Sequence, residues 1–498
     1  MLLGDADASA NCPYHLGVRR FGQCCAAALV SAIALAAATV VGAPAGSAAS
    51  AQGWARYGVD ASRPNSSAAS TGITVASLAQ LQRRQVALPG TADSSAVYAP
   101  GVKVGAATHD VFIVTTTYGI TIAIDAASGQ KLWTFTPPGY SGWAGSAQIT
   151  TATPLIDTAA GVVYAASPDG RVHALRLSNG HETKGWPVTV TRDPTHEKIA
   201  SALNLSRGLL LVTTGGYIGD APPYQGHVVT IHASTGHIAH VWNSLCSNRH
   251  SLLIPRTCAA SDSAIWGRGG AVVEPSSGRL LVATGNAPWD GKQNWGDSVL
   301  ELSPNASRLL QSFTPSNQDQ LDSSDADVGS ASPAVLPGGL VLQGGKDGTF
   351  RLLSLAHLNG HDDRLGRLGG ELQDVRAPGG SVVLTAPAVW TAGGRNLVAV
   401  ANDSGTALYR VRSRKLARVW ENATGGTSPV EAGGLLYVYD PHGGGLNVYR
   451  ASSRKPVGTL AAGAGHWNSP IVVDGRIALP EGNANDHSTQ GILDIWSR

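Results

Sequence analysis

The chain has 498 residues, a formal net charge of +2 and a charged fraction of only 14%. No stripe of Lys and Arg interleaved with aromatic residues accompanies this near-neutral balance, which argues against nucleic acid as a partner. Glycine (61) and proline (27) are spread along the chain, a turn-dense composition typical of β-rich globular proteins.

The first residues have the layout of a secretory signal, which we place at 1–51. Arg19 and Arg20 precede an apolar run from Ala26 to Ala43, and the small residues at 49–51 suit cleavage after Ala51. We therefore expect a secreted, periplasmic or cell-envelope protein with no stable membrane span after cleavage. The alternative is an uncleaved anchor, because the run approaches the length that crosses a bilayer.

Two of the five cysteines, Cys246 and Cys258, fall after this leader. In an exported chain such a pair is expected to form a disulfide. A metal-binding pair is the alternative, although no further Cys or His cluster completes such a site. The sequence contains no C-x-x-C-H motif, so no covalently attached haem is expected.

A pattern of short strands and turns recurs through residues 91–498 and makes eight units. Six units have a small-Pro-apolar entry, and two more begin without the proline near Ala202 and Gly269. The entry prolines are Pro100, Pro154, Pro333, Pro387, Pro429 and Pro470. Each unit holds alternating apolar runs at hairpin spacing, as in VFIVTT, ITIAID and KLWTF.

These units predict an all-β fold, a single eight-bladed β-propeller of four-stranded antiparallel blades, because ring closure removes exposed sheet edges. The last unit runs out of chain after three strands, so residues 83–90 (RRQVALPG) are expected to supply its outer strand. The lead at 52–90 thus contains the ring-closing strand, besides a short helix near Ser77 to Gln82.

The ends of the second strands align into one column, which we expect to ring one face near the propeller axis. Its members are Thr117, Pro168, Gly216, Asn286, Lys346, Asp403, His442 and Asn483. Three of the following turns are enlarged, namely GGYIGDAPPYQGH, GNAPWDGKQNWGD and GNANDHSTQG. Ligand sites on such scaffolds collect on loops of this kind.

The segment AIDAASGQKLWTF resembles the repeat of pyrroloquinoline quinone (PQQ) propellers, the quinoprotein alcohol dehydrogenase-like superfamily. That resemblance implies that Asp125, Gly129 and Trp133 lock adjacent blades. Enzymes and non-catalytic scaffolds share the repeat, so function depends on the site.

In the alcohol-oxidising members, calcium bound by a Glu and by the Asn of a GN-x-PW-like loop holds PQQ. GNAPWD matches that loop, which makes Asn286 the implied metal ligand. SSDADVGSASP resembles the segment that carries the base, so the resemblance makes Asp325 the catalytic residue. It also implies four cofactor-binding residues, Asp327, Lys346, Trp266 and Trp289. Calcium suits oxygen ligands, and a polarised quinone accepts hydride while a carboxylate takes the alcohol proton.

The sequence departs from this pattern in the third unit, where Tyr217 stands in place of the calcium-binding Glu and only Asp220 could substitute. The adjacent cysteine pair of many such enzymes is missing. The leading hypothesis is an exported oxidoreductase that oxidises an alcohol or sugar with PQQ and calcium and passes electrons to a separate acceptor. The alternative is a non-catalytic propeller that binds a polymer, peptide or envelope protein through the same face.

Overall fold

The computed structural model describes residues 53–498 except residues 220 and 363, so the predicted signal lies outside the described residues. The strands described below belong to the compact unit Ala51–Arg498. In the described part of the chain, no helix is both long and apolar enough to cross a membrane.

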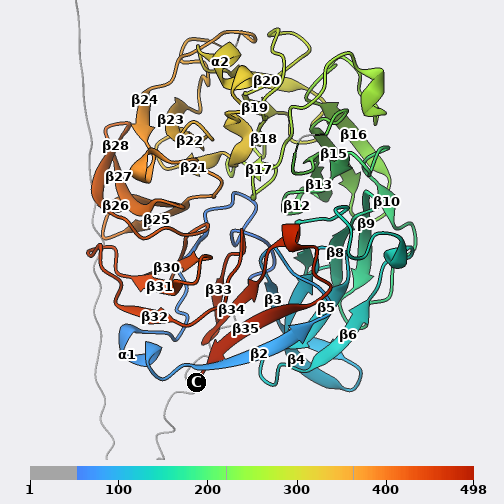
Figure 1. The fold of residues 1–498 in the computed structure, drawn as a ribbon, viewed down its shortest axis with the longest axis vertical. Helices are drawn as coiled ribbons and strands as arrows, with labels where there is room; N and C mark the ends of the chain where they lie inside the picture. Colours follow the sequence, from blue (N-terminus) through green and yellow to red (C-terminus); the bar gives the residue numbers. More distant parts are fainter. Residues whose placement is uncertain (1–52, 220, 363) are drawn as a thin grey trace, which may run out of the picture. The chain divides into compact units, whose positions relative to one another are not determined.

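Eight sheets follow one another around a ring, each an antiparallel blade of four strands (Figure 1). Blades one and two contain β3 (Val97–Val104), β4 (Ala107–Thr115), β5 (Thr121–Asp125), β6 (Lys131–Phe135), β7 (Leu155–Asp157), β8 (Val162–Ser167), β9 (Arg171–Arg176) and β10 (Val188–Thr189). Blades three and four contain β12 (Asn204–Ser206), β13 (Leu209–Thr213), β15 (His227–His232), β16 (Ile238–Asn243), β17 (Val272–Val273), β18 (Leu280–Ala283), β19 (Val299–Leu302) and β20 (Leu309–Phe313).

Blades five and six contain β21 (Ala334–Leu336), β22 (Leu340–Gly344), β23 (Thr349–Ser354), β24 (Gln373–Arg376), β25 (Ala388–Ala392), β26 (Arg395–Asn402), β27 (Gly405–Arg412) and β28 (Lys415–Asn422). Blade seven contains β29 (Val430–Ala432), β30 (Leu435–Asp440), β31 (Gly445–Tyr449) and β32 (Gly458–Leu460). Blade eight contains β33 (Ile471–Val473), β34 (Arg476–Glu481), β35 (Gly491–Ser497) and the N-terminal β2 (Gln82–Leu88).

The ring closes as the sequence predicts. β2 runs antiparallel to β35 over seven residue pairs, from Gln82 opposite Ser497 to Leu88 opposite Gly491. The N-terminal lead makes a second contact with the ring, because β1 (Ser66–Ser67) adds in parallel to β29. β2 and the last strand, β35, therefore share one blade, and the propeller is a single closed unit.

Burial along the blades explains why these segments form strands. The second strand is buried on both faces, as in β13 (LLLVT) and β22 (LVLQG), because neighbouring blades cover it on either side. Outer strands such as β28 (KLARVWEN) are mostly exposed or partly buried. Trp133 confirms the predicted lock between blades, since its indole N–H donates to the Leu177 carbonyl of blade two at 2.9 Å. Gly180 lies against the same ring, where a Cβ would come within 2.5 Å of it.

Two details differ from the sequence predictions. Pro100 lies inside β3 at a register shift between Ala99 and Val102, whereas the other entry prolines directly precede the first strand of their blade. The short helix of the lead is α1 (Val75–Leu78), which begins and ends earlier than predicted because Thr74 caps it through the Ser77 N–H. The remaining short elements are α2 (Gln318–Ser323), β11 (Glu197–Lys198), β14 (Gly215–Gly216), η1 (Tyr140–Gly142), η2 (Pro255–Thr257), η3 (Val328–Ser330), η4 (Pro378–Gly380) and η5 (Ala484–Asp486).

Candidate functional site

A cavity of about 370 Å³ is lined by residues between 93 and 485, which lie together only because the ring is closed. Entry segments to the blades contribute Asp93, Trp266, Asp325 and Asp327, and the predicted column contributes Gly216 and Lys346.

A second cavity of about 240 Å³ adjoins the first and shares Leu384, His466 and Trp467 with it. Three more column members, Asp403, His442 and Asn483, line this second cavity. The column therefore converges only in part, because Thr117, Pro168 and Asn286 line neither cavity.

Lys346 lies among the charged side chains of the first cavity and contacts two acids. Its Nζ lies 2.8 Å from Asp325 Oδ1 and 2.6 Å from Asp327 Oδ2. The same ammonium lies 5.4 Å from the ring centre of Trp266, within the range of a cation–π contact. Four residues singled out in the sequence, Trp266, Asp325, Asp327 and Lys346, therefore meet in one place.

The two carboxylates differ in environment. The Asp325 side chain is 56% exposed, whereas that of Asp327 is 5% exposed. Burial raises the pKa of Asp327, although the Lys346 charge and the Asn286 N–H oppose that rise. Burial disfavours the charge of Lys346, but the Asp327 carboxylate and the hydrogen bonds that Lys346 donates to both acids raise its pKa above the ordinary value. Lys346 is therefore a fixed cation at neutral pH, shared between two acids.

The loop GNAPWDGKQNWGD reaches this centre through its backbone. The Asn286 N–H donates to Asp327 Oδ1 at 2.6 Å, and a Cβ on Gly285 would come within 2.4 Å of that same oxygen. Glycine is needed at 285 for this close approach, which explains the Gly-Asn pair. Asn286 is not among the residues that line the cavity, and its role as a metal ligand stays a prediction.

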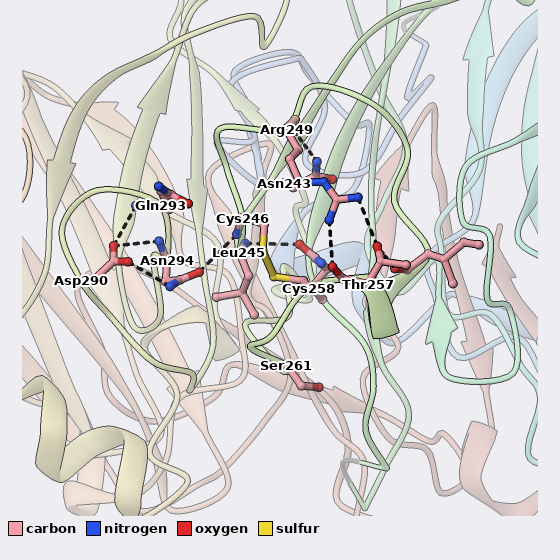
Figure 2. Close-up of a disulfide and its surroundings, with 12 residues drawn as sticks. Asn243, Leu245, Cys246, Arg249, Thr257, Cys258, Ser261, Asp290, Gln293 and Asn294 are labelled. Atoms are coloured by element: carbon pink, nitrogen blue, oxygen red, sulfur yellow. Dashed lines mark hydrogen bonds between the residues drawn. A yellow bond between two sulfur atoms is a disulfide. The ribbon is translucent and has the colours of Figure 1, made fainter.

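The rest of this loop packs outward, against the disulfide-bearing segment (Figure 2). Asn294 Oδ1 accepts the Cys246 N–H at 3.2 Å, and the buried Trp295 indole donates to Ser247 at 3.1 Å. Asp290 organises the turn by accepting the N–H groups of residues 292, 293 and 294. Trp289 forms an isolated bridge with Trp295 and lines neither cavity, and its contact with a cofactor stays a prediction.

The Cys246–Cys258 disulfide is present, with Cα atoms 6.1 Å apart. We expect the double variant Cys246→Ser/Cys258→Ser to lose about 3 kcal/mol of unfolding free energy, because the bridge closes a short loop in the unfolded chain. Urea unfolding of the oxidised wild type and the variant measures this difference. A reductant should destabilise the wild type and leave the variant unchanged. Equal midpoints for the two oxidised proteins would contradict the expectation.

The third blade presents Lys198 and Tyr217 to the first cavity, with the Lys198 Nζ 5.6 Å from the Tyr217 ring centre. Tyr217 stands at the position implied for a calcium-binding Glu, and its hydroxyl donates to the Pro194 carbonyl at 2.8 Å. Burial raises the pKa of Tyr217, so the phenol stays protonated. Asp220, the implied substitute, lies outside the described residues.

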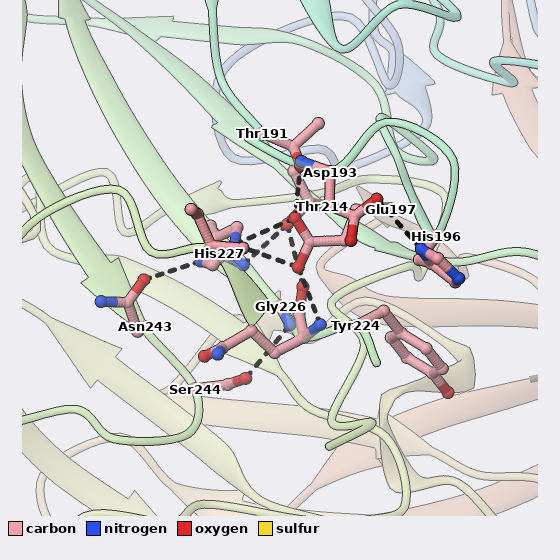
Figure 3. A network of polar contacts seen from close by, with 12 residues as sticks. Thr191, Asp193, His196, Glu197, Thr214, Tyr224, Gly226, His227, Asn243 and Ser244 are labelled. Atoms are coloured by element: carbon pink, nitrogen blue, oxygen red, sulfur yellow. Dashed lines mark hydrogen bonds and ion pairs between the residues drawn. The ribbon is translucent and has the colours of Figure 1, made fainter. Parts of the chain in front are cut away.

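Glu197, next to Lys198 in β11, belongs to a buried network (Figure 3). Its carboxylate accepts the Gln225 N–H at 2.9 Å, contacts His227 Nε2 at 3.1 Å and accepts the Thr191 hydroxyl. His227 Nδ1 lies 2.7 Å from Asn243 Oδ1. Because consecutive strand residues face opposite ways, this network holds Lys198 toward the cavity.

The Glu197–His227 pair is expected to make the free energy of unfolding depend on pH. Burial lowers the pKa of His227, but the Glu197 charge and the hydrogen bonds from His227 to Glu197 and Asn243 outweigh it and raise that pKa overall. The pair's contribution is therefore complete below the unfolded-state pKa of about 6.5 and disappears as pH rises through the higher folded-state value. We expect His227→Leu to cost about 3–5 kcal/mol at pH 6, because it leaves a buried carboxylate without its cation.

Urea unfolding of wild type and His227→Leu between pH 5 and 9 measures this cost, with Glu197→Gln/His227→Leu as the matched control that removes both charges. The difference between wild type and the single variant should shrink as pH rises. A cost that is equal in the single and double variants would contradict the argument.

No group of three or more His, Cys, Asp and Glu side chains among residues 53–219, 221–362 and 364–498 is arranged to hold a metal ion. Calcium also accepts amide and cofactor oxygens, so the predicted calcium stays a prediction. Asp325 and Asp327 share the single ammonium of Lys346. The cavity is lined by the Trp266 ring, by Lys198 and Lys346, and by three acids, Asp93, Asp325 and Asp327.

Sequence reasoning missed Asp93, Lys198, His466 and Trp467, which all line the first cavity. Each precedes the first strand of a blade, where the repeat signal is weakest. The only available signal was their place just before the small-residue entries, as in ADSSAVYAP and GHWNSP.

Comparisons with known proteins agree with this architecture. The sequence pattern of the family described as "Outer membrane protein assembly factor BamB" matches residues 92–267. The dehydrogenase subunit of an alcohol dehydrogenase (quinone) from Acetobacter aceti is 25% identical over 248 residues, which are 43% of this chain and 32% of that protein. The match thus spans about a third of the length of that relative.

Among solved structures, the quinohemoprotein alcohol dehydrogenase of Comamonas testosteroni has a TM-score of 0.65 at 15% identity, covering 89% of this chain and 80% of that one. A europium-containing methanol dehydrogenase has a TM-score of 0.66 at 14% identity, covering 90% and 98%. At such identities the likeness shows the fold. The repeat, the closed ring and the family pattern matched over residues 92–267 together support the PQQ-repeat β-propeller superfamily.

Proposed function

We propose that this chain is an exported quinoprotein dehydrogenase-like enzyme that oxidises an alcohol or sugar and passes the electrons to a separate acceptor. The observation that carries the proposal is the convergence of Trp266, Asp325, Asp327 and Lys346 on one cavity. The similarity to the quinone-dependent alcohol dehydrogenase subunit supports the same class.

In this proposal Trp266 supports a bound PQQ from one face, and Lys346 contacts it as a cation. Bound PQQ would supply a two-electron acceptor for hydride. Lys346 stabilises negative charge that develops beside it, because a fixed ammonium in a partly closed site needs no reorganisation. Asp325 and Asp327 hold that ammonium in place, and the implied role of Asp325 as the proton acceptor stays a prediction.

The experiment is an assay of the exported, purified protein for alcohol- and sugar-dependent dye reduction. Four conditions are compared: no addition, PQQ alone, PQQ with calcium, and PQQ with a chelator. We expect PQQ-dependent reduction by at least one substrate, and the calcium arms decide whether a metal takes part. Absence of substrate-dependent reduction in every arm would overturn the proposal, and a polymer or protein partner would then be the better reading of the same face.

A further inference from the structure

Asp93 and His466 form a carboxylate–imidazole pair at the wall between the two cavities. His466 Nδ1 lies 2.6 Å from Asp93 Oδ2, although the two residues are 373 positions apart. The pair joins the segment before blade one to the segment before blade eight. It exists only because the N-terminal strand closes the ring.

Asp93 is fully buried and held from several sides. Its carboxylate accepts the main-chain N–H groups of Trp467 at 3.0 Å and Ala484 at 3.1 Å, besides the imidazole. Burial alone would raise the pKa of Asp93, but His466, the Arg268 charge and the Ala484 N–H outweigh it and lower that pKa overall. Asp93 is therefore ionised and acts only as an acceptor.

An ionised Asp93 fixes the protonation pattern of the His466 imidazole ring. Nδ1 must carry the hydrogen that bonds Asp93, which leaves Nε2 as the basic nitrogen of the neutral imidazole. Nε2 makes no hydrogen bond within the described part of the chain. The ring lines both cavities and stacks on Trp467 with centroids 4.2 Å apart, and Trp467 in turn lies 5.6 Å from Trp266.

We propose that His466 accepts the hydroxyl proton of the substrate through Nε2, with Asp93 as its positioning residue. This assignment rests on the proposed function. The substrate O–H bond breaks and its proton moves to Nε2, while the C–H hydride and its electron pair pass to the bound quinone, leaving a carbonyl product. Release of the proton to solvent restores the neutral ring.

The assignment explains a difficulty with the two acids of the first cavity. Asp325 and Asp327 both contact the Lys346 ammonium, so a proton arriving on either would break an ion pair. His466 has an unused nitrogen, and the imidazolium formed there is stabilised by the Asp93 carboxylate. A positioned base of this kind contributes roughly 10²–10⁴-fold to rate.

Several charged groups lie around His466. Arg268 donates to the Asp93 carbonyl at 2.7 Å and lies 5.4 Å from the Trp467 ring centre. The other titratable groups that line the two cavities are Lys198, Tyr217, Tyr224, Asp325, Asp327, Lys346, Asp403 and His442. Any pH profile therefore needs the His466 variant itself as its reference.

The test uses PQQ-loaded enzyme and the variants His466→Gln, Asp93→Asn and Asp325→Asn, with the exposed His237→Gln as matched control. We expect His466→Gln to lower kcat/KM by roughly 10²-fold or more and to remove the acid limb of its pH profile, with PQQ affinity changed by less than about threefold. Asp93→Asn should lower kcat/KM and shift that limb, whereas His237→Gln should do neither. A limb that survives His466→Gln and disappears in Asp325→Asn would overturn the assignment.

A second readout needs neither cofactor nor turnover. In ¹⁵N-histidine-labelled protein, the His466 resonances, identified by their loss in His466→Gln, should report a protonated Nδ1 and an unprotonated Nε2 at alkaline pH. The reverse tautomer would overturn the assignment. If the wild type binds no PQQ, the proposed function fails. If the wild type turns over substrate but shows the reverse tautomer, or if the acid limb persists in His466→Gln, only the role of His466 is contradicted.

Discussion

Lys346→Met is expected to weaken PQQ binding by at least about 100-fold, a loss of roughly 2.7 kcal/mol. The substitution keeps most of the side-chain volume and removes the cation that the proposed function places against the quinone. It also leaves Asp325 and Asp327 facing each other without the ammonium that lies within 2.8 Å of both. Repulsion between these acids and an anionic cofactor adds to the loss.

Two further variants separate lost binding from lost folding. Lys346→Arg keeps the charge and should retain most of the affinity. Asp327→Asn/Lys346→Met removes the buried carboxylate along with its cation, so it should fold better than the single variant while still binding poorly. Fluorescence titration with PQQ and urea unfolding of all three measure both quantities. Wild-type affinity in Lys346→Met, in protein that is folded, would remove Lys346 from the cofactor site.

The second large effect concerns the ring-closing strand. A chain that begins at Gly90 should fail to fold cooperatively, because it lacks the seven residue pairs between β2 and β35. It also loses the buried side chains of Trp54, Val86 and Leu88. At about 1 kcal/mol per hydrogen bond and 1.5–3 kcal/mol per buried apolar side chain, the loss is comparable to the whole stability of a typical domain.

Val86→Ala is the matched mild variant and should cost about 1–3 kcal/mol while leaving the ring closed. Soluble yield and urea unfolding compare it with the truncated chain. A truncated chain with a cooperative transition near that of wild type would show that blade eight is stable with three strands. It would also show that β2 is dispensable to the ring.

The fold was largely predictable, because each blade repeats the same alternation of apolar strand and polar turn. β2 could be recognised because blade eight lacked one strand, and the Trp133 lock because it follows a local repeat. Pro100 was wrongly predicted to precede its strand like the other entry prolines. A local pattern cannot distinguish a proline before a strand from one at a register shift within it.

The residues of the candidate site could be predicted where they belong to a local sequence motif. They could not be predicted where closure of the propeller brings distant segments together. Lys346 and Asp327 follow recognisable segments, and they do meet. GNAPWD reaches the cavity's acids through the Asn286 N–H and the bare Gly285, since a motif does not reveal which atom it uses. Asp93 and His466 could not be paired from the sequence, because nothing local links residues 373 positions apart.

We propose that the cavity around Trp266 and Lys346 binds a quinone. Equilibrium dialysis of PQQ against the purified protein, with chelator and with calcium as separate arms, measures this binding. We expect saturable binding near one PQQ per chain that Lys346→Met removes and the exposed His237→Gln leaves intact. No saturable binding at micromolar PQQ in either arm would contradict it.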